Sequence, residues 1–191
     1  MAINLQKGQR IDIGLTKMTI GLGWDPNDGT GYDFDLDASA IMIDSQRKLV
    51  SEDYFVFYNN LNSPDGALTH TGDDPSGKNS NGDDDEAIMI DLSKVDSRVE
   101  EILFVVTIED FERRRQNFGQ VRNSYIRIVD QSNNQEIAKY ELDEDFSIET
   151  GIEFGRLYKK SGSWKFEASG IGYRADLGFF LEKYYKGEII K

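Results

Sequence analysis

Polar and apolar residues alternate along most of the 191-residue chain, and this period of two predicts β-strands. Gln9–Ile13 and Lys17–Leu22 alternate on either side of Gly14, which predicts a pair of neighbouring strands. The other predicted strands are Tyr54–Tyr58, Ala87–Leu92, Ile102–Ile108, Ser124–Val129, Glu136–Leu142, Glu153–Lys159 and Ser163–Ala168. Many short strands separated by turn signals predict an antiparallel β-sandwich.

A longer strand is predicted over Asp33–Ile43. Its first face consists of Phe34, Leu36, Ala38, Ala40 and Met42, which we expect in the core. The opposite face begins with Asp33, Asp35 and Asp37 and ends with Ile41 and Ile43. We therefore expect this strand to carry an ion-binding rim at one end and a covered middle.

Helical periodicity is confined to two places. Phe111–Asn117 is predicted as a short helix. Apolar residues spaced at i, i+4, i+7, i+8 and i+11 predict an amphipathic C-terminal helix lying on a sheet; they are Tyr173, Leu177, Phe180, Leu181 and Tyr184. The predicted fold is thus mainly β, an antiparallel β-sandwich with long acidic metal-binding loops and a C-terminal α-helix, in a single domain over residues 1–191.

The segment from Asn59 to Asp85 is predicted as one long loop rich in Asn, Asp, Gly, Ser and Pro. Loops of this length are uncommon in compact domains and are usually functional or disordered. Ordering each residue costs about 1–2 kcal/mol, and few apolar side chains are present to offset that cost. A cation bound by loop oxygens would offset it.

Composition narrows the possible functions. The net charge of -13 argues against nucleic acid as a direct ligand, because phosphates would be repelled. The chain contains no cysteine and one histidine, His70, so a transition-metal site is disfavoured. The sequence predicts no secretory signal and no membrane span, and we expect a cytoplasmic protein.

Acidic residues gather where two predicted strands begin, at Asp33–Asp37 and at Asp83–Glu86. Calcium takes 6–8 oxygen ligands from carboxylates, carbonyls and water, and this composition favours it over magnesium. An EF-hand is excluded because Ala38 and Asp44 occupy its required Gly and Glu positions. Asp33 and Asp37 lie about 13 Å apart on a straight strand, and two aspartate arms span about 12 Å. We therefore predict two ions side by side, with Asp35 shared or central.

The candidate ligands are Asp25, Asp33, Asp35, Asp37, Asn59, Asn60, Asp65, Asp73, Asp83, Asp84, Asp85 and Glu86. The alternative for the acidic residues is a solvated rim, and for Asp25 an ordinary turn. His70 is weighed as a general base against a loop hydrogen bond. Arg113–Arg115 is weighed as a recruiter of an acidic partner or of membrane headgroups against pairing with the protein's own acids.

Several segments, in order along nearly the whole chain, resemble the TerD family of tellurite-resistance and stress proteins. They are Gly23–Asp25, Asp33–Ser39, Phe57–Leu61, His70–Asp73, Asp84–Glu86 and Arg114–Val121. The resemblance implies a β-sandwich that binds calcium, commonly two ions, and has no enzymatic activity. It carries calcium ligation onto Asp33, Asp35, Asp37, Asp73, Asp84, Asp85 and Glu86. Two positions depart from the family pattern, Asp74-Pro75 after Asp73 and Asp83 in place of a glycine, which puts the second site's ligand set in question.

The resemblance also implies a role in tellurite and general stress resistance as a non-enzymatic binding or scaffold module. Its partners would be proteins of a stress-resistance complex, with the inner face of the membrane as one place for that complex. A second hypothesis is a phosphoryl hydrolase that uses two metal ions. A third, a calcium-dependent binder of anionic membranes, is disfavoured because few basic or aromatic residues flank the acidic loops.

Overall fold

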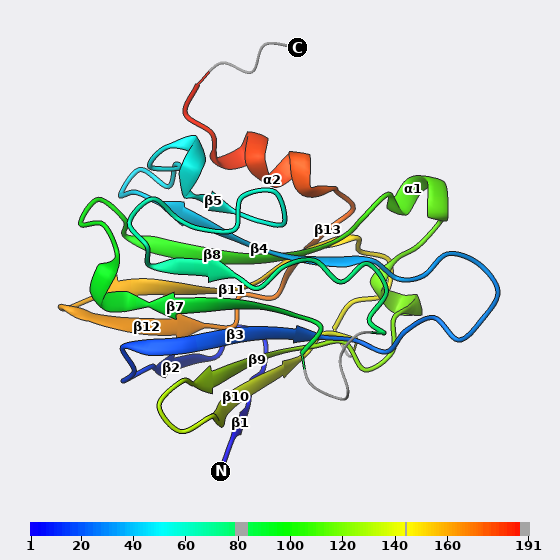
Figure 1. The fold of residues 1–191 in the computed structure, drawn as a ribbon, viewed down its shortest axis with the longest axis horizontal. Helices are drawn as coiled ribbons and strands as arrows, with labels where there is room; N and C mark the ends of the chain where they lie inside the picture. The colour runs from blue at the N-terminus through cyan, green and yellow to red at the C-terminus, as the bar shows by residue number, and fades with distance from the viewer. Residues whose placement is uncertain (79–83, 144, 188–191) are drawn as a thin grey trace.

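The computed structural model describes residues 1–78, 84–143 and 145–187 and forms two β-sheets (Figure 1). The first sheet contains, in spatial order, β1 (Ile3–Asn4), β10 (Gln135–Glu141), β9 (Tyr125–Asp130), β3 (Lys17–Gly23), β7 (Glu86–Asp91) and β6 (Leu68–His70). The second contains β2 (Arg10–Asp12), β12 (Ser163–Glu167), β11 (Gly151–Lys160), β8 (Glu101–Ile108), β4 (Leu36–Ile43) and β5 (Phe55–Val56), with β13 (Ile171–Tyr173) also paired to β11. Among the pairs between described strands, β1–β10 is parallel and the others are antiparallel.

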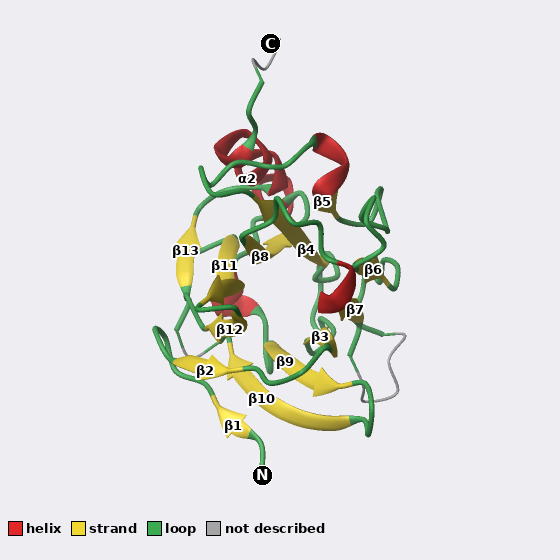
Figure 2. Cartoon of the chain, turned by 90° about the vertical axis from the view of Figure 1, so that its left-hand side faces the viewer, coloured by secondary structure: helices red, strands yellow, loops and turns green. Residues whose placement is uncertain are grey.

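The two sheets enclose one apolar core (Figure 2). Met18, Ile20 and Leu22 of β3 alternate into this core, each at most 1% exposed. Ile102 and Phe104 of β8 enter it from the second sheet. The period-two alternation in the sequence is therefore the packing of two inner faces against each other.

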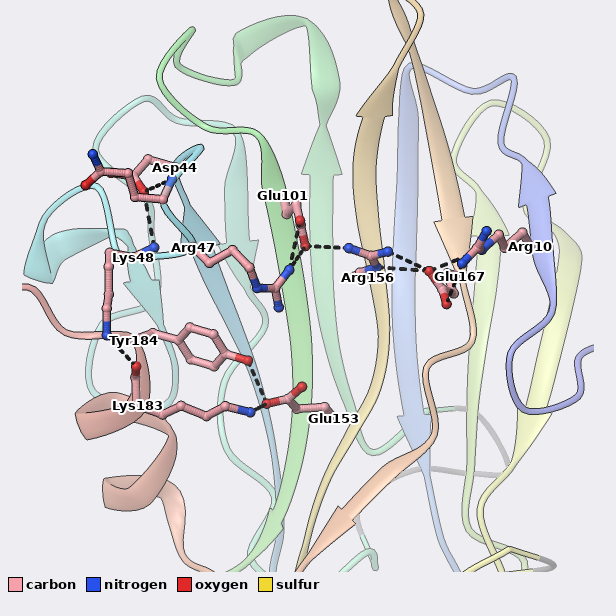
Figure 3. Close-up of polar contacts among 11 residues, drawn as sticks. Arg10, Asp44, Arg47, Lys48, Glu101, Glu153, Arg156, Glu167, Lys183 and Tyr184 are labelled. Atoms are coloured by element: carbon pink, nitrogen blue, oxygen red, sulfur yellow. Dashed lines mark hydrogen bonds and ion pairs between the residues drawn. The ribbon is translucent and has the colours of Figure 1, made fainter.

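The outer face of the second sheet is covered at its centre by α2 (Leu177–Tyr184) (Figures 1 and 3). The Glu153 carboxylate accepts hydrogen bonds from Lys183 Nζ and from the Tyr184 hydroxyl, each at 2.7 Å. Asp176 caps the helix by accepting from the Phe179 N–H. This cover explains why β8 is apolar on both faces: Val105, on its outer face, is buried as fully as Phe104 on its inner face.

Beside the helix, five charged side chains of alternating sign cross the outer face of the second sheet (Figure 3). In spatial order this charged row is Arg47, Glu101, Arg156, Glu167 and Arg10. Arg156 donates to Glu101 at 2.9 Å and to Glu167 at 2.7 Å. Each carboxylate of the charged row therefore contacts two guanidinium groups.

The remaining described helical turns are short. They are α1 (Phe111–Arg114) and the 3₁₀ turns Glu52–Tyr54, Leu92–Lys94 and Phe118–Gln120. None of the helices in the described part of the chain has the length and apolar composition needed to cross a bilayer.

The predicted mainly β sandwich with a C-terminal helix is confirmed. The β9–β10 and β11–β12 hairpins pair as expected. The prediction that Gln9–Ile13 pairs with Lys17–Leu22 is wrong, because β2 joins β12 and β3 joins β7 and β9 in the other sheet. Gly14, with φ of 59°, sits in a crossing between sheets rather than in a hairpin.

Three element boundaries also differ from the predictions. The strand predicted over Tyr54–Tyr58 is reduced to β5, because a 3₁₀ turn ends at Tyr54. The loop predicted from Asn59 to Asp85 contains a strand, β6, which pairs with β7. Tyr173 belongs to β13 rather than to the C-terminal helix, because its backbone pairs with Gly151.

Candidate metal centre

Asp35, Asp37 and Asp73 place one carboxylate oxygen each within 4.8 Å of one another. Asp35 is 8% exposed and Asp37 3% exposed, whereas Asp73 lies at the surface. We call this group the carboxylate cluster. It is the one such group of acidic, His or Cys side chains found across the described residues.

The fold brings these three residues together from both sheets. Asp37 lies in β4 opposite Thr107 of β8, and Asp35 is held just before β4 by the Glu109 N–H, which donates to its carbonyl at 2.9 Å. Asp73 follows β6, the edge strand of the other sheet, after Thr71 bonds to Ala87. The cluster is therefore a contact between the ends of two sheets.

Burial and mutual repulsion oppose ionisation of the cluster. Burial and, after it, the neighbouring acids, Glu86 and Asp35 foremost, together raise the pKa of Asp37 to about 9. Burial also raises the pKa of Asp35 to about 6, although the Arg114 guanidinium opposes that shift. A divalent cation would reverse this balance, because it stabilises the ionised forms.

Three residues outside the predicted set face the cluster. Arg114 Nη1 lies 3.3 Å from Asp35 Oδ2. Glu109 and Tyr58 lie close enough for their charges to affect each other's ionisation. Burial raises the pKa of Tyr58, and the negative charge of Glu109 raises it in the same direction. Glu109 also raises the pKa of Asp37. Glu109 directly follows the most apolar predicted strand. If that strand had been paired antiparallel with β4, Glu109 would have been placed beside the start of β4.

The donor set fits a hard cation. Three carboxylates offer the oxygen ligands that calcium prefers, and neither Asp37 nor Asp73 receives a hydrogen bond or ion pair from any described residue. Two buried oxygens on neighbouring segments, Ser39 Oγ and Gln116 Oε1, also accept no hydrogen bond within the described ranges. Buried polar atoms are rarely left in this state.

Glu86, a predicted ligand, lies outside the carboxylate cluster. Its carboxylate is buried between the sheets, where it accepts from the Ala38 N–H at 2.8 Å and from the Asp74 N–H at 3.3 Å. β5 pairs with β4 only at Ala40 and Ile41, so it does not reach the free edge of Ala38. Glu86 fills that edge from the opposite sheet. Burial raises its pKa, while the nearby His70 opposes the shift.

His70 completes this edge. The Gly72 N–H donates to His70 Nδ1 at 3.0 Å, which leaves the proton of the neutral ring on Nε2. Nε2 lies 3.0 Å from the Ala38 carbonyl and 3.5 Å from Glu86. A buried hydrogen bond, the alternative weighed against a general base, accounts for this histidine.

Asp84 and Asp85 point to the first sheet. Asp84 accepts from the Tyr125 hydroxyl at 3.0 Å and from Arg127 at 2.8 Å. It lies across Gly21, where a Cβ would come within 2.0 Å of its carboxylate, so a side chain there would displace Asp84. Asp85 accepts from the Trp24 N–H at 2.9 Å.

Asp25 and Asp85 line one hollow of about 330 Å³ beside Trp24. The Asn123 side-chain amide donates to Asp25 at 2.6 Å. Glu141 and Lys139 also line this hollow, so its charge is mixed.

The other predicted ligands lie elsewhere. Asp33 forms an ion pair with Lys78 at 2.6 Å. Asn60 donates to the Phe55 and Asp53 carbonyls, and Asp65 accepts from Ser63 and from backbone N–H groups in its turn. Asn59 is exposed, and Asp83 lies outside the described residues. Asp33 and Asp65 are not part of the carboxylate cluster.

Relatives of known sequence cover almost the full chain. General stress protein 16U of Bacillus subtilis (strain 168) is 46% identical over 191 residues, covering 96% of this chain and 97% of its own. Tellurium resistance protein TerD of Serratia marcescens is 44% identical over 189 residues, with the same coverage.

A solved structure supports the same fold. The crystal structure of a Streptomyces coelicolor A3(2) homologue of telluride resistance protein (TerD) superimposes with a TM-score of 0.72 and 20% identity. It covers 88% of this chain and 96% of the other. A family model described as the TerD domain matches residues 1–184. The chain therefore belongs to the TerD domain family.

Proposed function

We propose that this protein is a calcium-binding β-sandwich that acts as a non-enzymatic binding module in tellurite and general stress resistance. The carboxylate cluster is the observation that supports calcium, because it buries two acids without enough positive charge to neutralise them. The names of the relatives, a general stress protein and a tellurium resistance protein, support the physiological role.

The first ion would be held by Asp35, Asp37 and Asp73. We place a second ion in the hollow lined by Asp25 and Asp85. Bound calcium would supply positive charge between the sheet ends and hold the acidic loops in one conformation. Protein partners of a cytoplasmic stress-resistance complex, at the inner face of the membrane, would then recognise that ordered surface.

Terbium luminescence tests the ion site directly. Tb³⁺ takes calcium's oxygen ligands, and Trp24 lies beside the acidic loops while Trp164 lies on β12. In a Trp164→Phe background, we expect excitation of Trp24 to sensitise Tb³⁺ emission that calcium displaces. Asp37→Asn should remove the calcium-displaceable emission that comes from the carboxylate cluster, while emission from the hollow beside Trp24 persists. Asp53→Asn, an exposed acid whose side chain has no partner among the described residues, should leave both unchanged. Equal titrations of the two variants would remove the proposal.

A two-metal phosphoryl hydrolase is the second candidate, and one observation favours it. Arg114 lies at the cluster, where a guanidinium would stabilise charge on a transferring phosphoryl group. Hydrolysis of p-nitrophenyl phosphate, assayed with magnesium, manganese and calcium, separates the two candidates. Turnover that Asp37→Asn abolishes would establish the hydrolase, and its absence with all three ions would dismiss it.

A further inference from the structure

A cavity of about 470 Å³ opens between α1, α2 and the segment that follows β5. It is lined on one side by Phe57, Tyr58 and Phe111 and on the other by Leu181. Figure 1 shows α2 lying above β4 and β8, with β5 beside it and α1 toward the same side. We call this cavity the aromatic cavity, and it is distinct from the hollow beside Trp24.

Three aromatic rings that line the cavity contact one another in series, Phe55, Phe57 and Tyr58. The ring centroids of Phe55 and Phe57 are 5.1 Å apart, and those of Phe57 and Tyr58 are 5.2 Å apart with an edge-to-face angle of 76°. Phe57, Tyr58 and Phe111 are only half-buried, and Leu181 is 36% exposed. Aromatic faces left open to solvent in a cavity are a common feature of binding sites.

The rim of the aromatic cavity is acidic, and two of its carboxylates have no counter-charge among the described residues. Glu109 and Glu112 both line it and are exposed. Neither carboxylate forms an ion pair or hydrogen bond with another described residue, whereas the adjacent Asp110 pairs with Arg113. Arg113 thus neutralises Asp110 at the rim and Arg114 pairs with Asp35, so neither arginine is paired with Glu109 or Glu112.

We propose that the aromatic cavity docks an arginine side chain of a partner protein, with an apolar neighbour of that arginine resting on Leu181. A guanidinium group stacks on aromatic faces and donates in a fork to carboxylates, so it matches both the wall and the rim. An acidic segment would be repelled by Glu109 and Glu112. The inference rests on the binding-module role proposed above, and it does not require that a cation be bound.

The probe is the peptide acetyl-Gly-Leu-Arg-Leu-Gly-amide, titrated into the full-length ¹⁵N-labelled protein with 2 mM calcium and again with chelator. We expect saturable amide shifts confined to residues that line the aromatic cavity. The same peptide with citrulline in place of arginine keeps the shape and removes the charge, and it should bind about tenfold more weakly. Calcium binding, measured on the same sample by calorimetry, keeps failure of this inference separate from failure of the calcium proposal.

Glu112→Gln tests the rim. Because this residue is exposed, the substitution leaves the fold intact, and we expect affinity for the arginine peptide to fall about threefold, as for an exposed ion pair. Glu182→Gln on α2 makes the same charge change outside the cavity and should not alter affinity. Equal binding of the arginine and citrulline peptides, no binding at millimolar peptide, or an unaffected Glu112→Gln variant would each overturn the inference. Shifts in the cavity that grow with protein concentration alone would also overturn it, because they would identify a second copy as the occupant.

Discussion

The carboxylate cluster and the charged row on the second sheet both contain several acids, but they differ in how much positive charge the chain supplies to neutralise them. In the charged row, Glu101 and Glu167 each contact two arginines (Figure 3). In the cluster, Arg114 contacts Asp35, and Asp37 receives no positive charge from the described residues. The row is also the more exposed of the two at its ends, since the Arg47 and Arg10 side chains are 50% and 62% exposed.

This difference indicates where charge must come from outside the chain. An ionised carboxylate in a buried position is costly unless it is paired, and the charged row supplies its own pairs. The cluster does not, so it is stable either with protons bound or with a cation bound. Substitutions in one region can therefore be compared with substitutions in the other.

Removing the charge of Asp37 should have the largest effect. At a calcium concentration 100 times the Kd, ligand linkage stabilises the folded wild type by about 2.7 kcal/mol, or about 5–10 °C in Tm. Asp37→Asn should lose this calcium-dependent shift. Its metal-free Tm should exceed that of the metal-free wild type, because a buried acid beside other acids is gone. Differential scanning calorimetry with calcium and with chelator measures both, and a wild-type shift retained by the variant would contradict the cation account.

Weakening the attachment of α2 should be costly but independent of calcium. Glu153→Gln removes the charge that Lys183 and Tyr184 share. We expect a loss of about 1–2 kcal/mol and a Tm lower by about 3–7 °C. The loss should be equal with calcium and with chelator, since Glu153 is not one of the acids of the carboxylate cluster. Glu182→Gln on the same helix provides the control, and a calcium-dependent difference would show that the two regions are coupled.

Calcium binding should release protons. Burial raises the pKa of Asp37 to about 9, so at neutral pH the metal-free folded state holds a proton that the unfolded chain has lost above about pH 4. The metal-free protein should therefore lose stability as pH rises from about 4 to 9. Calcium affinity should rise over the same range, by up to about tenfold, or about 1.4 kcal/mol, for each pH unit. Calorimetry at pH 7 in buffers of different ionisation enthalpy measures the released proton, and identical apparent enthalpies would refute its release.

Disturbing the charged row at its exposed end should have the smallest effect. Arg47→Ala leaves Glu101 paired with Arg156. We expect a loss of about 0.2–1 kcal/mol, which 1 M NaCl should reduce further. Urea unfolding at low and high salt measures it. A loss several times larger would mean that the row acts as a cooperative network.

Much of the fold was readable from the sequence because β-sandwich packing imposes a local signal. Each inward residue of β3 and β9 is followed by an outward one, and the hairpins that join neighbouring strands leave turn residues between them. The run Ile102–Ile108, which is apolar at both inward and outward positions, correctly predicted a central strand. The helical stripe near the C-terminus correctly predicted the helix that covers this strand.

The partners of β2 and the existence of β6 were not readable in this way. Two strands that are close in sequence and separated by a glycine usually pair with each other as a hairpin. Here long-range packing places β2 and β3 in different sheets. β6 has three residues in a polar segment, too few to establish a periodicity.

For the site, the sequence by itself determined that acids would collect at strand starts, because the residue types and their alternation are local properties. Only the tertiary structure decided which acids meet. In the folded chain Glu86 and Asp84 form structural hydrogen bonds, and Asp33 forms an ion pair with Lys78. Asp73, by contrast, lies beside Asp35 and Asp37. The physical reason is that a cluster needs side chains from both sheets within a few ångströms, and that distance depends on how the sheets pack, which no single stretch of sequence encodes.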